Sequence, residues 1–234
     1  MNKKKKKNNV LLWSIIGIFV VGIIVTFITL NLNKEKDNPL TSTGGKENVV
    51  EQKVIANPET LNEINEKETI YYEGEETATN EILFVFDYAC PWCKKWEAEV
   101  FPKVEELIGE GTVKYRTQSM VYLNDVSLLL ANFDQNVKNY YPNKYTEINQ
   151  KIMLDGNNHV ADWGTSGYLQ GIIHDYKLDE NKVLETPSQD SIGVTRSYTK
   201  ALEIDSVPTV FVNGVQVNDA FNYNEIEELL KETK

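Results

Sequence analysis

The stretch Glu81-Ile82-Leu83-Phe84-Val85-Phe86-Asp87-Tyr88-Ala89-Cys90-Pro91-Trp92-Cys93 decides the fold of this chain. It begins with a continuous apolar run over residues 82–86, which is typical of a central strand buried on both faces. Beyond Cys90, apolar residues recur at intervals of three and four and predict a helix with one buried face: Cys93, Trp96, Val100, Val104 and Leu107. The cysteine pair therefore lies where a buried strand meets the N-terminus of a helix.

The only two cysteines of the chain, Cys90 and Cys93, are best interpreted as a redox dithiol. A zinc site would need two more ligands, and His159 and His174 are 15 residues apart instead of the three to five of a zinc finger. Haem attachment requires a histidine after the second cysteine, where this chain has Lys94. A structural disulfide across so short a loop would add only about 2 kcal/mol. The dipole of the helix and its free backbone N–H groups are expected to lower the pKa of the Cys90 thiol.

The sequence after the motif alternates between strand and helix patterns. Pro102 is expected to kink or divide the first helix, because proline lacks a backbone N–H group. Residues 112–118 alternate as a strand does. Asn213-Gly214 predicts a hairpin between strands 208–212 and 215–217, and Asn224 with Glu227 opens a last helix.

Between the second strand and the hairpin, residues 124–202 have a helical pattern. Helices are expected at 125–139, 143–154, 165–176, 180–184 and 189–202. The stretch Asp155-Gly156-Asn157-Asn158 lacks the glutamate and the spacing of an EF-hand loop, so we expect a turn there instead of a calcium site.

Three stretches resemble the thioredoxin superfamily, and within it the membrane-anchored DsbA-like thiol:disulfide oxidoreductases of Gram-positive bacteria. They are residues 87–94 around the cysteines, 101–104 and 207–214, and the likeness covers about 54–234. The resemblance implies an α/β thioredoxin-like fold with a large helical insertion, about 124–202, between the C-x-x-C unit and a hairpin opened by a cis-proline. A separation of 118 residues between Cys90 and Pro208 fits this arrangement.

The resemblance also implies roles for individual residues. Cys90 and Cys93 would be the catalytic pair and form the redox-active disulfide, supported by Pro91, Trp92 and Pro208. Val207 and Pro208 would present backbone groups to an extended substrate. Neither a cofactor nor a metal is expected.

The chain departs from the family pattern in two places. Thioredoxins and many DsbA-like proteins have a buried carboxylate six residues before the first cysteine, where this chain has Phe84. Asp87 cannot simply be assumed to replace that carboxylate. The motif also has Trp92 where the best-known periplasmic relatives have a histidine. Tyr88 and Trp92 are candidates for an apolar surface near the cysteines, although aromatic residues more often pack in the core.

The N-terminal region predicts a membrane anchor. Residues 10–30 are uncharged and, as a helix, would span about 30 Å of hydrocarbon. Five lysines precede them, so the N-terminus is expected in the cytoplasm and the rest outside. A cleaved signal peptide is the alternative, but its apolar region is usually about 7 to 15 residues long and is followed by a cleavage site. The expected organisation is a basic tail (1–9), a single-pass anchor (10–30), a flexible tether (31–53) and a catalytic domain (54–234).

The charge of the 234-residue chain divides in the same way. Its formal net charge is -11, but residues 1–36 hold seven of the 24 basic and one of the 35 acidic residues. The remainder has 17 basic and 34 acidic residues, a charge of -17, which disfavours nucleic acid as a partner. With 41% hydrophobic and 25% charged residues, the chain is expected to fold.

These features predict an extracytoplasmic enzyme that introduces disulfides into exported proteins. The resemblance further implies reoxidation by a quinone-linked, DsbB-like membrane partner. A membrane-anchored reductase or isomerase is the alternative, because the direction of exchange depends on a few kcal/mol at one thiolate. A chaperone-like binding module is a third possibility.

Overall fold

The computed structural model describes residues 71–232, which contain a mixed sheet with the strand order β2-β1-β3-β4. Strand β1 (Asn80–Phe86) runs parallel to β2 (Val113–Ser119) and antiparallel to β3 (Thr209–Val212), and β3 pairs with β4 (Val215–Gln216). Because β1 has a neighbour on each side and buried residues on both faces, the predicted central strand is confirmed.

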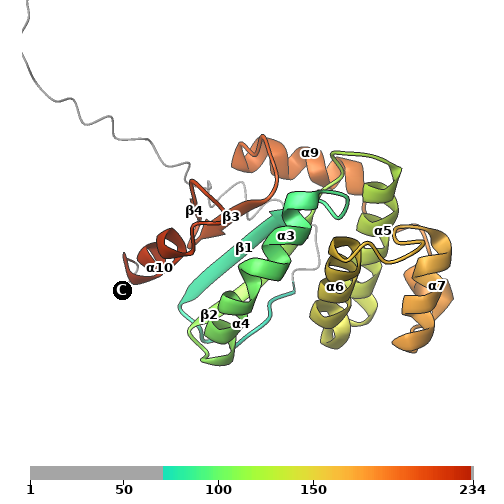
Figure 1. Ribbon diagram of the computed structural model, residues 1–234, viewed down its shortest axis with the longest axis horizontal. Helices are drawn as coiled ribbons and strands as arrows, with labels where there is room; N and C mark the ends of the chain where they lie inside the picture. Colours follow the sequence, from blue (N-terminus) through green and yellow to red (C-terminus); the bar gives the residue numbers. More distant parts are fainter. Residues whose placement is uncertain (1–70, 233–234) are drawn as a thin grey trace, which may run out of the picture. The chain divides into compact units, whose positions relative to one another are not determined.

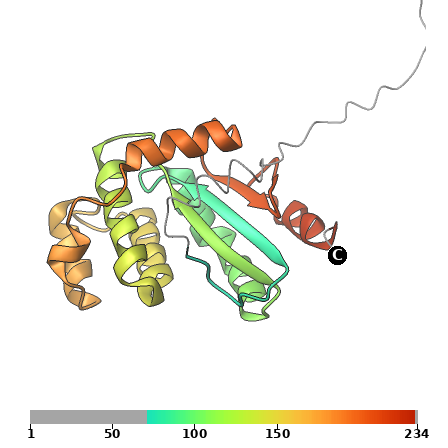
Figure 2. The same ribbon diagram turned by 180° about the vertical axis from the view of Figure 1, so that it is seen from behind.

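Helices cover both faces of this sheet (Figures 1 and 2). Side chains alternate along a strand, so Ile82, Phe84 and Phe86 join one core cluster and Leu83 and Val85 join another. The first cluster includes residues of α3 (Pro91–Glu99), α4 (Phe101–Gly109) and α10 (Tyr223–Glu232), and the second includes residues of α9 (Ser191–Leu202). The continuous apolar run of β1 is thus explained by burial on two sides.

The expected division of the first helix is also observed. Helix α3 ends at Glu99 and α4 begins at Phe101, with Val100 between them. Pro102 stands in the first turn of α4, where a missing N–H group costs no hydrogen bond. In the interior of one continuous helix Pro102 would remove a hydrogen bond, whereas in the first turn of α4 it does not.

The helical block is inserted between β2 and β3, as predicted. It consists of α5 (Asp125–Tyr140), α6 (Pro142–Asn157), α7 (Ser166–Asp175), α8 (Glu180–Val183) and α9. In both views α5, α6 and α7 lie beside the sheet, and α6 contacts α3 (Figures 1 and 2). The insertion thus reaches the helix that carries the cysteines.

The prediction of a turn at residues 155–158 is wrong, because α6 continues to Asn157. Gly156 is buried against Lys94 of α3 and Trp163, and a Cβ atom there would lie 2.7 Å from an atom of each side chain. The indole Nε1 of Trp163 donates to the backbone oxygen of Ile152 at 2.7 Å. The close packing of Lys94 and Trp163 therefore requires a glycine at this position of α6. The turn propensity of residues 155–158 does not determine where α6 ends.

The predicted tail (1–9), anchor (10–30) and tether (31–53) lie outside the described residues. Within residues 71–232, no helix is both long and apolar enough to cross a bilayer. The beginning of the catalytic domain at residue 54 also stays a prediction.

Candidate active site

Cys90 and Cys93 lie at the junction of β1 and α3. Cys90 is the N-cap residue of α3 in an extended conformation, and Pro91 occupies the first turn, where its fixed φ angle suits a helix. Both cysteines are free thiols in this structure. Cys93 is completely buried, whereas 6% of the surface of Cys90 is accessible. Only Cys90 can therefore meet another molecule without movement of the backbone.

The pKa of the Cys90 thiol is lowered to about 6. The largest cause is a hydrogen bond from the Cys93 thiol, and the backbone N–H groups of Cys93 and Trp92 add to it. Burial and the charge of Asp87 oppose these effects but do not cancel them. A thiol with this pKa is mostly thiolate at neutral pH, in the direction expected for a helix N-terminus.

The pKa of Cys93 moves the opposite way. Burial raises it first, and the neighbouring Cys90 raises it further, through both the hydrogen bond and the charge of its thiolate. Cys93 therefore retains its proton while Cys90 is ionised. The reduced pair holds one proton and one negative charge, and the proton lies between the two sulfur atoms.

The segment before β3 faces Cys90 from the other end of the sequence. The Val207–Pro208 peptide bond is cis, as expected from the resemblance. The Sγ atom of Cys90 lies 3.6 Å from the backbone oxygen of Val207, and in its protonated form the thiol can donate to that oxygen. The structure thus brings together Cys90 and the Val207–Pro208 pair, although more than a hundred residues separate them.

Exposed aromatic and aliphatic side chains occur in the first turn of α3 and in the segment that follows β2. Trp92 is 59% exposed, and its ring meets that of Phe221 edge to face, with centroids 6.1 Å apart. The Nζ atom of Lys95 lies 5.2 Å from the Trp92 centroid. Tyr122 and Leu123, which follow β2, are exposed as well. Of the two aromatic candidates from the sequence, Trp92 is accessible and Tyr88 is not.

Tyr88 is buried because its hydroxyl group belongs to a polar network. It donates to Asp134 of α5 at 2.6 Å and accepts from the Asn149 side chain of α6 at 2.7 Å. The segment that leads to Cys90 is thereby attached to two helices of the insertion.

The position of the missing carboxylate is filled by an aromatic stack. Phe84 is fully buried and stacks on Trp96 of α3, with ring centroids 3.9 Å apart. The indole Nε1 of Trp96 donates to the backbone oxygen of Ala220 at 2.8 Å, which holds the segment before α10 against α3. No proton acceptor can therefore reach Cys93 from position 84.

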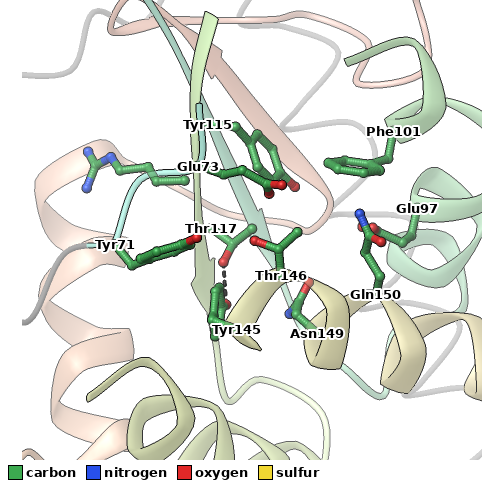
Figure 3. Close-up of a pocket in the computed structure, with 11 residues that line it drawn as sticks. Tyr71, Glu73, Glu97, Phe101, Tyr115, Thr117, Tyr145, Thr146, Asn149 and Gln150 are labelled. Atoms are coloured by element: carbon green, nitrogen blue, oxygen red, sulfur yellow. Dashed lines mark hydrogen bonds between the residues drawn. The ribbon is translucent and has the colours of Figure 1, made fainter. Parts of the chain in front are cut away.

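A buried carboxyl that sequence reasoning missed lies one turn further along α3. Glu97 is 3% exposed, and burial, followed by the charges of Glu73 and Glu105, raises its pKa to about 8. Its Oε2 atom, like Glu73 Oε2 and the Tyr115 hydroxyl, has no hydrogen-bond partner among residues 71–232. All three residues line one small cavity (Figure 3), which has room for roughly one water molecule. The sequence contained one signal for the burial of Glu97: it follows Cys93 by four residues and so lies on the apolar face of the helix.

A metal centre is not apparent in this part of the chain. Among residues 71–232, no group of three or more His, Cys, Asp or Glu side chains is arranged to hold an ion.

Comparison with known families agrees with this geometry. Residues 65–232, more than half of the chain, match the thioredoxin family. The chain belongs to the thioredoxin family. Among curated members, it is 24% identical to disulfide bond formation protein D of Bacillus subtilis over 165 residues, which cover 68% of this chain and 74% of that protein. A probable disulfide bond formation protein D of Bacillus anthracis is 20% identical and is covered to 89%.

Two solved bacterial structures have the same fold. Oxidised BdbD from Bacillus subtilis superposes with a TM-score of 0.63 at 23% identity, over 70% of this chain and 92% of that one. The thiol-disulfide exchange protein α-DsbA2 from Wolbachia pipientis gives a TM-score of 0.59 at 17% identity, over 75% and 93%. Together with the family match, these relatives support the assignment of this chain as a DsbA-like thiol:disulfide oxidoreductase.

Proposed function

We propose that this thioredoxin-family enzyme is a membrane-anchored oxidase that introduces disulfides into exported proteins through Cys90 and Cys93. The observation that supports the oxidising direction is the Cys90 thiol, whose pKa is lowered to about 6 by the buried Cys93 thiol and by backbone N–H groups. A stabilised thiolate favours the reduced enzyme, and a stable reduced form makes the disulfide a strong oxidant.

The reaction begins with the Cys90–Cys93 disulfide. A substrate thiolate attacks Cys90 Sγ, the bond to Cys93 breaks, and Cys93 takes up a proton, because burial favours its neutral form. The second thiolate of the substrate then attacks the substrate sulfur of the mixed disulfide, and Cys90 leaves as a thiolate. The substrate has lost two electrons and two protons and has gained a disulfide. The enzyme has gained the two electrons and keeps one proton on Cys93, and the other proton is released to solvent.

Substrate binding is assigned to the groups around Cys90. Val207 and Pro208 offer backbone groups to an extended chain, in the manner of a short added strand. Trp92, Tyr122 and Leu123 supply exposed apolar surface for reduced, unfolded clients. Pro91 supports the site by fixing the first turn of α3.

The location rests on residues 1–30. Five lysines followed by 21 uncharged residues favour a single-pass anchor with a cytoplasmic N-terminus and an extracytoplasmic catalytic domain. Reoxidation needs an electron acceptor, and we assign this step to a quinone-linked, DsbB-like partner in the same membrane. Reporter fusions before residue 10 and after residue 234 test the orientation: the two ends must respond oppositely to a reporter that is active only outside the cell.

The direction of exchange is decided by the reduction potential. The full-length protein in detergent is equilibrated with glutathione redox buffers, and the fraction of free thiols is measured. We expect a potential well above that of thioredoxin, about -270 mV, and towards that of DsbA, about -120 mV. A potential close to that of thioredoxin would indicate a reductase.

The role of the thiols is tested by Cys90→Ser in cells that lack the wild-type protein. We expect exported proteins to accumulate in the reduced form, because the variant cannot form the mixed disulfide. Full restoration of disulfide formation by this variant would contradict the catalytic role and favour a chaperone-like binding module.

A further inference from the structure

Asp87 is a buried carboxylate that the exchange reaction does not use. It follows β1, three residues before Cys90, and none of its surface is accessible. Its own backbone oxygen accepts from the Cys90 N–H group at 2.9 Å. Asp87 therefore belongs to the turn that carries the Cys90 thiol, and its side chain points into the protein.

Four donors surround the Asp87 carboxylate. Oδ1 accepts from the Ala89 N–H group at 2.8 Å and from the Ser127 hydroxyl at 2.7 Å. Oδ2 accepts from the N–H groups of Tyr122 at 2.9 Å and Leu123 at 3.2 Å. Every one of these partners is a donor, so both oxygens of the carboxylate act as acceptors.

The same hydrogen bonds connect two parts of the fold. Ala89 belongs to the turn before Cys90, whereas Ser127 lies in the first turn of α5, which Asn124 caps. Tyr122 and Leu123 are the exposed residues that precede α5. One carboxylate therefore holds the turn of Cys90 against the beginning of the helical insertion.

The buried negative charge of Asp87 destabilises a thiolate at Cys90 or Cys93. The charge of Asp87 raises the pKa of Cys90 and that of Cys93. Lys94 is the cation on α3 that interacts with both thiols and with Asp87, and burial lowers its own pKa. The Lys94 ammonium also lies 4.4 Å from the centroid of the Trp163 ring.

We propose that Asp87 is a positioning residue that moderates the oxidising strength of the Cys90–Cys93 pair. Its hydrogen bonds hold the Cys90 turn in place, and its fixed charge disfavours the Cys90 thiolate and so the reduced enzyme. The inference rests on the proposed oxidase function for its biological meaning, but the electrostatic effect is a property of the isolated protein.

The test compares Asp87→Asn with Ser127→Ala in the full-length protein. Asparagine removes the charge and keeps an acceptor for the Tyr122 and Leu123 N–H groups. Its amide nitrogen can donate to the Ser127 hydroxyl, and the Ala89 N–H group loses its acceptor. We expect the Cys90 pKa to fall by about 0.5 to 1 unit, because a nearby like charge is lost. The equilibrium with glutathione should shift about threefold to tenfold towards the reduced enzyme, and tenfold corresponds to about 30 mV.

Ser127→Ala is the control, because it removes one hydrogen bond from Asp87 and leaves the charge. We expect it to lower the unfolding temperature and to leave the Cys90 pKa unchanged or slightly raised. If both variants raise the Cys90 pKa, Asp87 acts only as a structural support and the proposal is wrong. If Asp87→Asn does not fold, Asp87→Ser replaces it, with the same expected direction.

The two hypotheses fail separately. A wild-type potential close to that of thioredoxin would contradict the oxidase function, yet the difference between Asp87→Asn and wild type would still be measurable. A potential near that of DsbA without such a difference would contradict only the role of Asp87.

Discussion

Cys90 and Cys93 have the same side chain and lie in the same helical turn, yet their pKa values move in opposite directions. Cys90 has residual access to solvent and receives hydrogen bonds, whereas Cys93 is enclosed, keeps its proton and donates a hydrogen bond to the neighbouring sulfur. The asymmetry makes one sulfur the point of attack and the other the internal leaving group. It arises because burial raises the pKa of Cys93, whereas the hydrogen bond from the Cys93 thiol lowers that of Cys90.

Removal of the Cys93 thiol should therefore change the reactivity of Cys90. We expect Cys93→Ala to raise the Cys90 pKa from about 6 by roughly one unit or more, because the largest stabilising hydrogen bond is lost. Cys93→Ser keeps a donor and should raise it less. Thiolate absorbance near 240 nm, followed as a function of pH, measures both values. An unchanged pKa in Cys93→Ala would instead assign the effect to the backbone N–H groups.

Glu97 predicts a pH dependence of stability that does not involve the thiols. Its pKa is raised to about 8 in the folded protein, so the folded state keeps a proton that the unfolded chain loses above about 4.5. The free energy of unfolding should therefore fall as the pH rises from about 4.5 to 8. The charged groups at the cavity are Glu73 and Arg116, which line it, and Glu105 of the neighbouring α4 adds its charge.

Glu97→Gln removes this titration. We expect the variant to gain stability relative to wild type by about 3 to 4 kcal/mol between pH 5 and pH 8. Urea unfolding of the oxidised protein measures this change without ionisation of Cys90. A constant difference between variant and wild type over this range would show that Glu97 titrates normally in the folded state.

The sequence could predict residues whose role depends on local context, but not those whose role depends on distant neighbours. Cys90 and Pro208 stand in recognisable motifs, and the structure brings them to the same place. Glu97 was missed because a glutamate on a helix is usually solvated. Its burial depends on Tyr115 of β2 and Gln150 of α6, which no local pattern connects to it.

At the scale of elements, the predicted helices and strands are confirmed except where packing overrides local propensity. The apolar run of β1, the break before Pro102 and the hairpin at Asn213-Gly214 all have local causes. The end of α6 has no such local cause. Its continuation through Gly156 depends on Trp163 and on Lys94 of another helix, both of which approach the glycine closely.

Gly156→Ala tests this contact between α3 and α6. In an exposed helix the substitution would stabilise by about 1 kcal/mol, but here the new Cβ would lie 2.7 Å from Lys94 Cδ and from Trp163 Cε2. We expect a net loss of about 1 to 3 kcal/mol, as for other overpacked cores. Gly171→Ala in α7 is the matched control, because no atom lies within 4 Å of its added Cβ. It should be neutral or stabilising in thermal unfolding, and similar effects of both substitutions would contradict a tight α3–α6 contact.

At the scale of the whole described domain, a buried polar network joins the insertion to the sheet. Its centre is the ion pair between Asp134 and Lys138, whose N···O distance is 3.1 Å. Asp134 also accepts hydrogen bonds from Tyr88, Tyr145 and Ser119, so residues of the Cys90 segment, α6 and β2 all meet on one helix of the insertion. In sequence the pair has the spacing of an ordinary surface pair, and only the fold reveals its burial.

The network predicts that the insertion and the sheet unfold together. Lys138→Met should lower the free energy of unfolding by about 3 kcal/mol, because it leaves the buried charge of Asp134 without a cation. The double variant Asp134→Asn with Lys138→Met should recover much of this loss, since the uncharged amide of the asparagine needs no cation beside it. Tyr88 links the network to Cys90, so both probes, tryptophan fluorescence and Cys93 alkylation, should report one transition in urea. If Cys93 of the Lys138→Met protein became reactive at lower urea than the fluorescence transition, the insertion and the sheet would be separate folding units.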